Sequence, residues 1–153
     1  MSSDGATSGD SGDVLEALGR ETYLSLVTYR RDGSERPTPV WVVRDGDRLL
    51  VTTAAGTAKV RRARRDPRGT VTPCDQRGRV QPGAPTRAVA VEVSEDPAVL
   101  RRTADLLRHK HPIGYRLVSA AHTVHDHLPR RGAREGAVTG QVSLVLRLVG
   151  HAS

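Results

Sequence analysis

The chain has 153 residues and a mass of 16.5 kDa, which fits one domain and excludes separate catalytic and regulatory modules. Hydrophobic residues make up 37% of it and aromatic residues only 3%, so Val, Leu and Ala must build the core. The net charge of +7 and the isoelectric point near 10.6 favour anionic partners, which are nucleic acid, phosphorylated cofactors or acidic chains.

The composition also indicates where the protein works. No stretch approaches the roughly 20 apolar residues of a membrane helix, and the N-terminus lacks the charged-then-apolar pattern of a signal peptide. Cys74 is the only cysteine, which excludes an internal disulfide and fits a reducing compartment. We therefore expect a cytoplasmic protein without a membrane partner.

The first part of the chain predicts a tail, a helix and three strands. Residues 1–13 are mostly Ser, Gly and Asp and predict a flexible tail, so that one domain spans 14–153. A short helix is expected over Val14 to Arg20, capped by Asp13. Alternating β-forming residues joined by Asp-Gly turns then predict an antiparallel meander of three strands: Tyr23–Tyr29, Pro39–Arg44 and Leu49–Thr53.

The second part predicts two helices and three more strands. Ala54–Arg65 has helix-forming residues and stops before Asp66-Pro67, and Pro97–Lys110 is amphipathic. The remaining strands are expected over Thr70–Asp75, Ala88–Ser94 and Gln141–Val149. Six strands with two or three peripheral helices predict a mainly β (α+β) fold, an antiparallel barrel and not a βαβ array.

The segment from Thr38 to Lys59 carries the pattern with the most chemistry. Thr52 and Thr53 end a strand, a helix follows, and Lys59 lies in its first turns. We expect the two hydroxyls, the open amides of the helix and the ammonium to converge on a phosphate. Upstream, two prolines withhold backbone donors and leave the edge of their strand open to something planar: Pro37 and Pro39.

Several motifs from Tyr23 to Arg79 recur in a known order: Thr38-Pro39-Val40-Trp41, Thr52-Thr53, Lys59-Val60-Arg61, Arg64-Arg65-Asp66-Pro67-Arg68, and Cys74-Asp75 followed by Arg77-Gly78. Together they resemble the pyridoxamine 5′-phosphate oxidase-like superfamily of FMN-binding split β-barrels, and within it the actinobacterial F420-dependent branch. The resemblance implies a six-stranded split β-barrel and a homodimer with cofactor sites at the subunit interface.

The resemblance also assigns cofactor contacts. It implies that one strand lies beside the isoalloxazine-like ring, with the residues Thr38, Pro39, Val40 and Trp41 along it. It implies that Thr52 and Thr53 meet the ribityl phosphate and that Lys59 binds it. Arg64 and its neighbours would meet the acidic oligoglutamate tail of coenzyme F420, and Cys74 would be a wall residue beside the flavin.

The activity that the resemblance implies is hydride transfer from reduced F420 to an electron-poor small molecule such as an enone, imine or tetrapyrrole. No motif places a Tyr or His as the proton donor. An FMN-dependent reductase or oxidase and a non-catalytic flavin or haem carrier remain alternatives. The C-terminal Trp and Arg pair of the true oxidases is missing, which speaks against oxidation of vitamin B6, and Lys110-His111 stands where relatives often carry Lys-Tyr.

Other motifs have simpler explanations. The arginine run of 61–68 lacks the aromatic residues that stack bases, so nucleic acid is disfavoured. Cys74 has no partner motif and is expected to be a buried thiol, and Trp41 can equally fill the core. The histidines have the composition of a metal site, but no Cys or closely spaced Glu completes a tetrahedral set, so no metal is expected: His109, His111, His122, His125 and His127.

Overall fold

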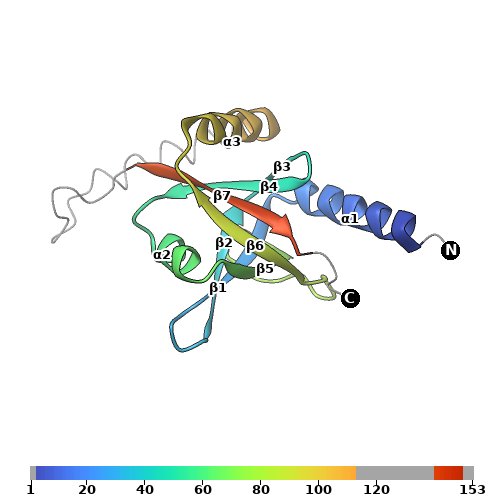
Figure 1. The fold of residues 1–153 in the computed structure, drawn as a ribbon, viewed down its shortest axis with the longest axis horizontal. Helices are drawn as coiled ribbons and strands as arrows, with labels where there is room; N and C mark the ends of the chain where they lie inside the picture. The colour runs from blue at the N-terminus through green and yellow to red at the C-terminus, as the bar shows by residue number, and fades with distance from the viewer. Residues whose placement is uncertain (1–2, 113–139, 150–153) are drawn as a thin grey trace.

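The computed structural model describes residues 3–112 and 140–149. These residues form three helices and seven strands (Figure 1): α1 (Ser3–Arg20), β1 (Tyr23–Tyr29), β2 (Glu35–Trp41), β3 (Val43–Asp45), β4 (Arg48–Ala54), α2 (Ala58–Arg65), β5 (Arg68–Cys74), β6 (Arg87–Ser94), α3 (Pro97–Lys110) and β7 (Gln141–Leu148).

The strands form one antiparallel sheet in the order β2-β1-β5-β6-β7-β4-β3. The two end strands of this order, β2 and β3, follow each other in the chain with only Val42 between them. The chain therefore bends at Val42, pairs with β1 before the bend and with β4 after it, and curls the sheet into a split β-barrel. This confirms the predicted fold class. The strand count is seven because the single strand expected over Pro39–Arg44 is divided at the bend.

The main core fills the inside of the barrel, and two helices close it. Leu15 and Leu18 of α1 pack into this core, and so do Val60 and Ala63 of α2. The two helices lie at opposite ends of the barrel (Figure 1). Burying a Leu or Val side chain contributes about 1.5 to 3 kcal/mol of hydrophobic stabilisation, so Leu15 and Leu18 fix α1 to the sheet and Val60 helps to fix α2.

A second core cluster lies on the outside of the barrel, under α3. It consists of Val43, Leu50, Leu107 and Val145, with Trp41 packed against it. Successive strand residues point to opposite faces, so β4 is covered on its inner face by the main core and on its outer face by α3. The helix begins as the sequence predicts, with Pro97 in its first turn and the Asp96 side chain accepting from the Ala98 amide at 2.9 Å.

Two helix starts differ from the expectation. Helix α2 begins at Ala58 and not at Ala54, because Ala54 still belongs to β4 and the Thr57 amide donates to its carbonyl in a turn at 3.3 Å. Helix α1 begins at Ser3, whereas the sequence predicts a helix from Val14 after a flexible tail. The residues before Val14 have low intrinsic helix propensity, but propensity is only a weak predictor of structure. Extending a helix that has already formed also costs less free energy than nucleating a new one.

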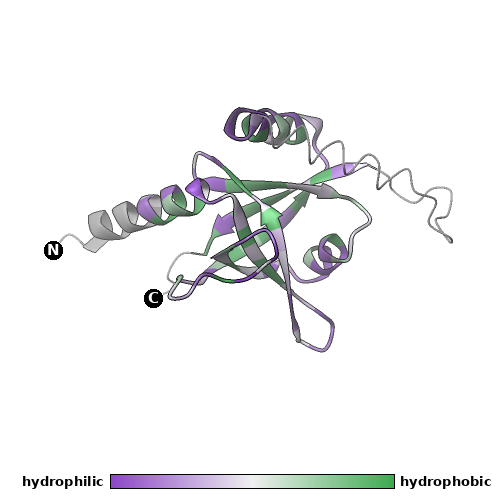
Figure 2. Cartoon of the chain, turned by 180° about the vertical axis from the view of Figure 1, so that it is seen from behind, coloured by the Kyte–Doolittle hydropathy of each residue, from purple (hydrophilic) through white to green (hydrophobic). Residues whose placement is uncertain are grey.

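The hydropathy of the chain follows this architecture. Figure 2 shows mainly hydrophobic residues on the central strands, and hydrophilic residues on the β1–β2 turn and on part of α2. Within residues 3–112 and 140–149, no helix is both long and apolar enough to cross a membrane.

Candidate functional site

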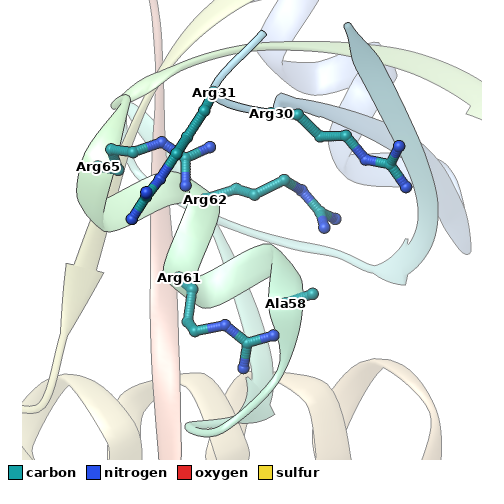
Figure 3. Close-up of a pocket in the computed structure, with 6 residues that line it drawn as sticks. All are labelled: Arg30, Arg31, Ala58, Arg61, Arg62 and Arg65. Carbon is teal, nitrogen blue, oxygen red and sulfur yellow. The ribbon is translucent and has the colours of Figure 1, made fainter. Parts of the chain in front are cut away.

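A pocket of about 260 Å³ lies between the turn after β1 and the helix α2 (Figure 3). Five arginines and one alanine line it: Arg30, Arg31, Ala58, Arg61, Arg62 and Arg65. The four α2 residues share one helical face because they are spaced three or four positions apart. The turn after β1 supplies the other two arginines from the opposite side.

Hydrogen bonds to uncharged acceptors tether three of these arginines: Arg62 Nε to Thr28 Oγ1 at 2.7 Å, Arg65 Nη2 to the Tyr29 carbonyl at 2.7 Å, and Arg61 Nη1 to the Gly56 carbonyl at 2.9 Å. A hydroxyl or a carbonyl holds a guanidinium in place without neutralising it. The pocket therefore combines three tethered guanidinium groups with a net positive charge.

Many of the described arginines outside the pocket form salt bridges. Eight of them pair with carboxylates: Arg20, Arg48, Arg64, Arg68, Arg79, Arg102, Arg108 and Arg147. No arginine of the pocket pairs with a carboxylate from the described part of the chain. Burial, followed by the charges of Arg36 and Arg30, lowers the pKa of Arg62 below its usual value. A multiply charged anion would relieve this repulsion, so the pocket has the chemistry of an anion site.

Lys59 adds a further cation beside the pocket. It lies one helical turn before Arg62 and is half-buried. Burial and the charge of Arg62 lower the pKa of its ammonium, and the described residues offer that ammonium no hydrogen-bond acceptor. The N-cap hydroxyl of Thr57 donates to the Ala54 carbonyl at 3.1 Å and leaves the first-turn amides of α2 uncapped. The ammonium and these amides fit the predicted phosphate.

The two threonines of the predicted phosphate site point apart. Thr53 is 4% exposed and shares the inner face of β4 with the main core. Thr52 lies on the other face, with its hydroxyl 3.4 Å from Gln141 Oε1. Adjacent residues of a strand alternate between faces, so the structure does not bring the two hydroxyls to one point.

The strand expected beside the cofactor ring is an edge strand. β2 pairs with β1 alone among the described strands, as the prolines predicted. Thr38 is half-buried and Pro39 is exposed, whereas the Val40 side chain lies in the main core. Gly78, with a φ of +86°, lies against the Pro39 ring, and a Cβ there would be 3.4 Å from Pro39 Cδ. The motif around Pro39 and the motif after Cys74 therefore adjoin.

Trp41 belongs to an aromatic cluster on the outer side. Its ring centroid is 6.1 Å from that of Tyr23, edge to face, and 5.1 Å from that of His111. Among the described residues His111 Nε2 has no hydrogen-bond partner although it is buried, and burial together with the charge of Lys110 lowers the pKa of the imidazole. Trp41 is thus partly buried against the outer core cluster, a position that is compatible with both roles that the sequence left open.

The remaining predicted site residues lie away from the pocket. Arg64 forms an exposed salt bridge with Glu95 at 3.0 Å and does not line the pocket. Cys74 is buried at the end of β5, and burial followed by the charge of Asp75 raises the pKa of its thiol. Cys74 is thus an unreactive thiol at neutral pH.

The Asp66-Pro67-Arg68 motif has a structural role. Arg68 pairs with Asp66 at 2.8 Å, and hydrogen bonding to Arg68 lowers the pKa of Asp66 to about 2. The same guanidinium lies 5.3 Å from the centroid of the Tyr29 ring. These contacts join the end of α2 and the start of β5 to the end of β1.

The sequence did not predict most of the residues that line the pocket. The sequence predicts a hairpin turn over Arg31 to Ser34 and indicates nothing about Arg30, and only the fold places this turn beside α2. Helical spacing offers one signal that the prediction did not use, because Arg61, Arg62 and Arg65 share a face and Arg64 does not. The metal-like histidines His122, His125 and His127 lie outside the described residues.

No protein-family model and no curated protein matches the sequence. Solved structures do match. A Listeria innocua protein named after pyridoxamine 5′-phosphate oxidase is 14% identical, with a TM-score of 0.53 and coverage of 92% of this chain and 98% of that one. An F420 reductase is 20% identical, with a TM-score of 0.51 and coverage of 88% and 92%. A heme storage protein from Vibrio cholerae is 12% identical, with a TM-score of 0.57 and coverage of 93% and 90%.

These similarities define the fold class. The chain has the split β-barrel fold of the pyridoxamine 5′-phosphate oxidase-like proteins, which confirms the resemblance at the level of fold. Solved examples of this fold include an F420 reductase and a heme storage protein, so the site must carry the argument for function.

Proposed function

We propose that this chain is an oxidoreductase that binds reduced coenzyme F420 and transfers a hydride from it to an electron-poor small molecule, such as an enone, imine or tetrapyrrole. The observation that carries the proposal is the arginine-lined pocket beside Lys59, in which no arginine forms a salt bridge with a carboxylate from the described residues. An F420 reductase with the same fold supports it.

The donor set fits such a cofactor. Lys59 and the uncapped amides of α2 would hold its phosphate, and the arginines of the pocket, in place of Arg64, would hold its acidic tail. The exposed edge of β2 at Thr38 and Pro39 would lie along the ring, with a second subunit completing the site. The bound deazaflavin supplies the hydride, while these residues bind and orient it and exclude water.

The charge of the pocket favours F420 over FMN. FMN offers one phosphate dianion, which Lys59 and the helix amides can satisfy alone. Five arginines beyond that site exceed what a single phosphate needs and suit an additional acidic chain. The heme storage protein with this fold makes a non-catalytic haem or flavin carrier the second candidate.

Titration of the purified protein with F420, FMN and haem tests the proposal. We expect F420 to bind more tightly than FMN, and Lys59→Ala to weaken F420 binding roughly 10- to 100-fold, because a charge-assisted hydrogen bond contributes about 1.5 to 3 kcal/mol. Arg64→Ala is the control, since Arg64 is a basic residue of the same helix that pairs with Glu95 outside the pocket. Tight binding of FMN or haem without F420 binding would overturn the proposal.

A further inference from the structure

Thr28 is a polar side chain that is completely buried. It lies on β1, is 0% exposed, and its cross-strand neighbour in β2 is Arg36. Its hydroxyl accepts a hydrogen bond from Arg62 Nε at 2.7 Å. Burying a hydroxyl is unfavourable unless it is hydrogen-bonded, and here the guanidinium supplies the bond.

Arg62 needs such a tether. In Figure 3 it lies at the centre of the pocket, with the other arginines around it. Burial and the like charges of nearby arginines lower the pKa of Arg62, and these charges would drive a free side chain out toward solvent. The bond to Thr28 uses the Nε donor of the guanidinium and leaves the four N–H donors of the two Nη atoms, for which the described residues supply no acceptor.

We infer that Thr28 is a positioning residue for anion binding: its hydroxyl fixes the guanidinium of Arg62, so that the pocket recognises a phosphate or carboxylate ligand that carries two or more negative charges. This inference rests on the part of the proposed function that makes the pocket a ligand site. A planar guanidinium held in one orientation can bind such groups through two parallel hydrogen bonds.

Two substitutions separate the hydroxyl from the shape of the side chain. Thr28→Val keeps the volume and removes the acceptor, whereas Thr28→Ser keeps the acceptor. We expect Thr28→Val to weaken binding of inorganic pyrophosphate about tenfold in calorimetric titrations, and Thr28→Ser to stay within about twofold of the native protein.

Thr103→Val is the matched control. Thr103 is also 0% exposed, and its hydroxyl bonds to the Val99 carbonyl and to Ser143 under α3, away from the pocket. This variant should lower the midpoint of thermal unfolding without changing pyrophosphate affinity. Circular dichroism of each variant verifies that it is folded before the titration.

The outcomes separate the inference from the proposed function. Normal pyrophosphate affinity in Thr28→Val together with weakened affinity in Arg62→Ala would refute the role of Thr28 and leave the pocket as a ligand site. An equal loss in Thr28→Val and Thr28→Ser would assign Thr28 to packing and also refute it. Unchanged affinity in Arg62→Ala would remove the pocket from the proposed function itself.

A second ligand identifies the source of the anion. Tri-γ-glutamate carries carboxylates in place of phosphates. The inference is supported if either probe competes with F420 for the native protein and competes less well for the Thr28→Val variant. If tri-γ-glutamate competes more strongly than pyrophosphate, the pocket binds a carboxylate chain. Failure of both probes to bind the native protein would overturn it.

Discussion

The two lysines of the chain have opposite environments. The Lys110 ammonium donates to the carbonyls of Gly19 and Glu21 at 2.6 Å and of Val42 at 2.8 Å. It therefore ties the end of α3 to the link between α1 and β1 and to the bend between β2 and β3. Lys59 has no acceptor among the described residues and stands beside Arg62. Lys110 therefore stabilises the fold, whereas Lys59 is the lysine that we propose to bind the cofactor phosphate.

Substituting each lysine by methionine tests this division. Lys110→Met should lower the free energy of unfolding by about 2 to 4 kcal/mol, because three carbonyls lose a charged donor. Lys59→Met should leave it unchanged or raise it, because the repulsion with Arg62 disappears. Urea denaturation measures both, and equal losses would contradict the assignment.

His111 makes stability depend on pH. Burial, and then the charge of Lys110, hold the pKa of the folded imidazole below its usual 6.5, so the unfolded chain takes up a proton first as the pH falls. The stability that is present above about pH 6.5 is therefore lost as the pH falls through the folded pKa. In urea denaturation at about pH 8 and pH 5, His111→Phe should lose less stability than the native protein. An identical loss in both proteins would show that other groups dominate.

At the scale of elements, the sequence predicts a helix boundary correctly where neighbouring residues determine it. Helix α3 has its Asp96 cap and Pro97 in the sequence itself, and the structure reproduces its span. The bend at Val42 has no such signal, because it depends on the Lys110 contact and on strands that are distant in the sequence. Contacts between segments that are distant in the sequence are also the reason why the position of Arg30 and Arg31 beside α2 was not predicted. Lys59 was predicted because its signal, a lysine in the first turns of a helix, is local.

Helix α1 can be tested with its own glycine. Gly12 lies in the helix, and an added Cβ would meet nothing within 4 Å. Gly12→Ala should therefore raise the free energy of unfolding by up to about 1 kcal/mol and increase the helical signal in circular dichroism. Gly33→Ala, at a turn residue with a φ of +86°, should destabilise the protein. No effect of Gly12→Ala would favour the flexible tail that the sequence predicts.

At the scale of the whole molecule, the homodimer remains a prediction. The resemblance implies cofactor sites at a subunit interface, and a core without Phe leaves burial for a second subunit to complete. Sedimentation equilibrium at micromolar concentration should give about twice the chain mass of 16.5 kDa, with or without cofactor. A monomer mass under both conditions would contradict it.

The prolines of β2 have a consequence for behaviour in concentrated solution. Pro37 and Pro39 pair with Val27 and Ser25 of β1, which a proline can do only where its missing N–H would face away from the neighbour. The outer edge of β2 therefore presents carbonyls without amide donors at both positions. A strand from another molecule needs both carbonyl acceptors and amide donors at this edge to extend the sheet. The edge of β2 can therefore be exposed to solvent without starting amyloid-like stacking.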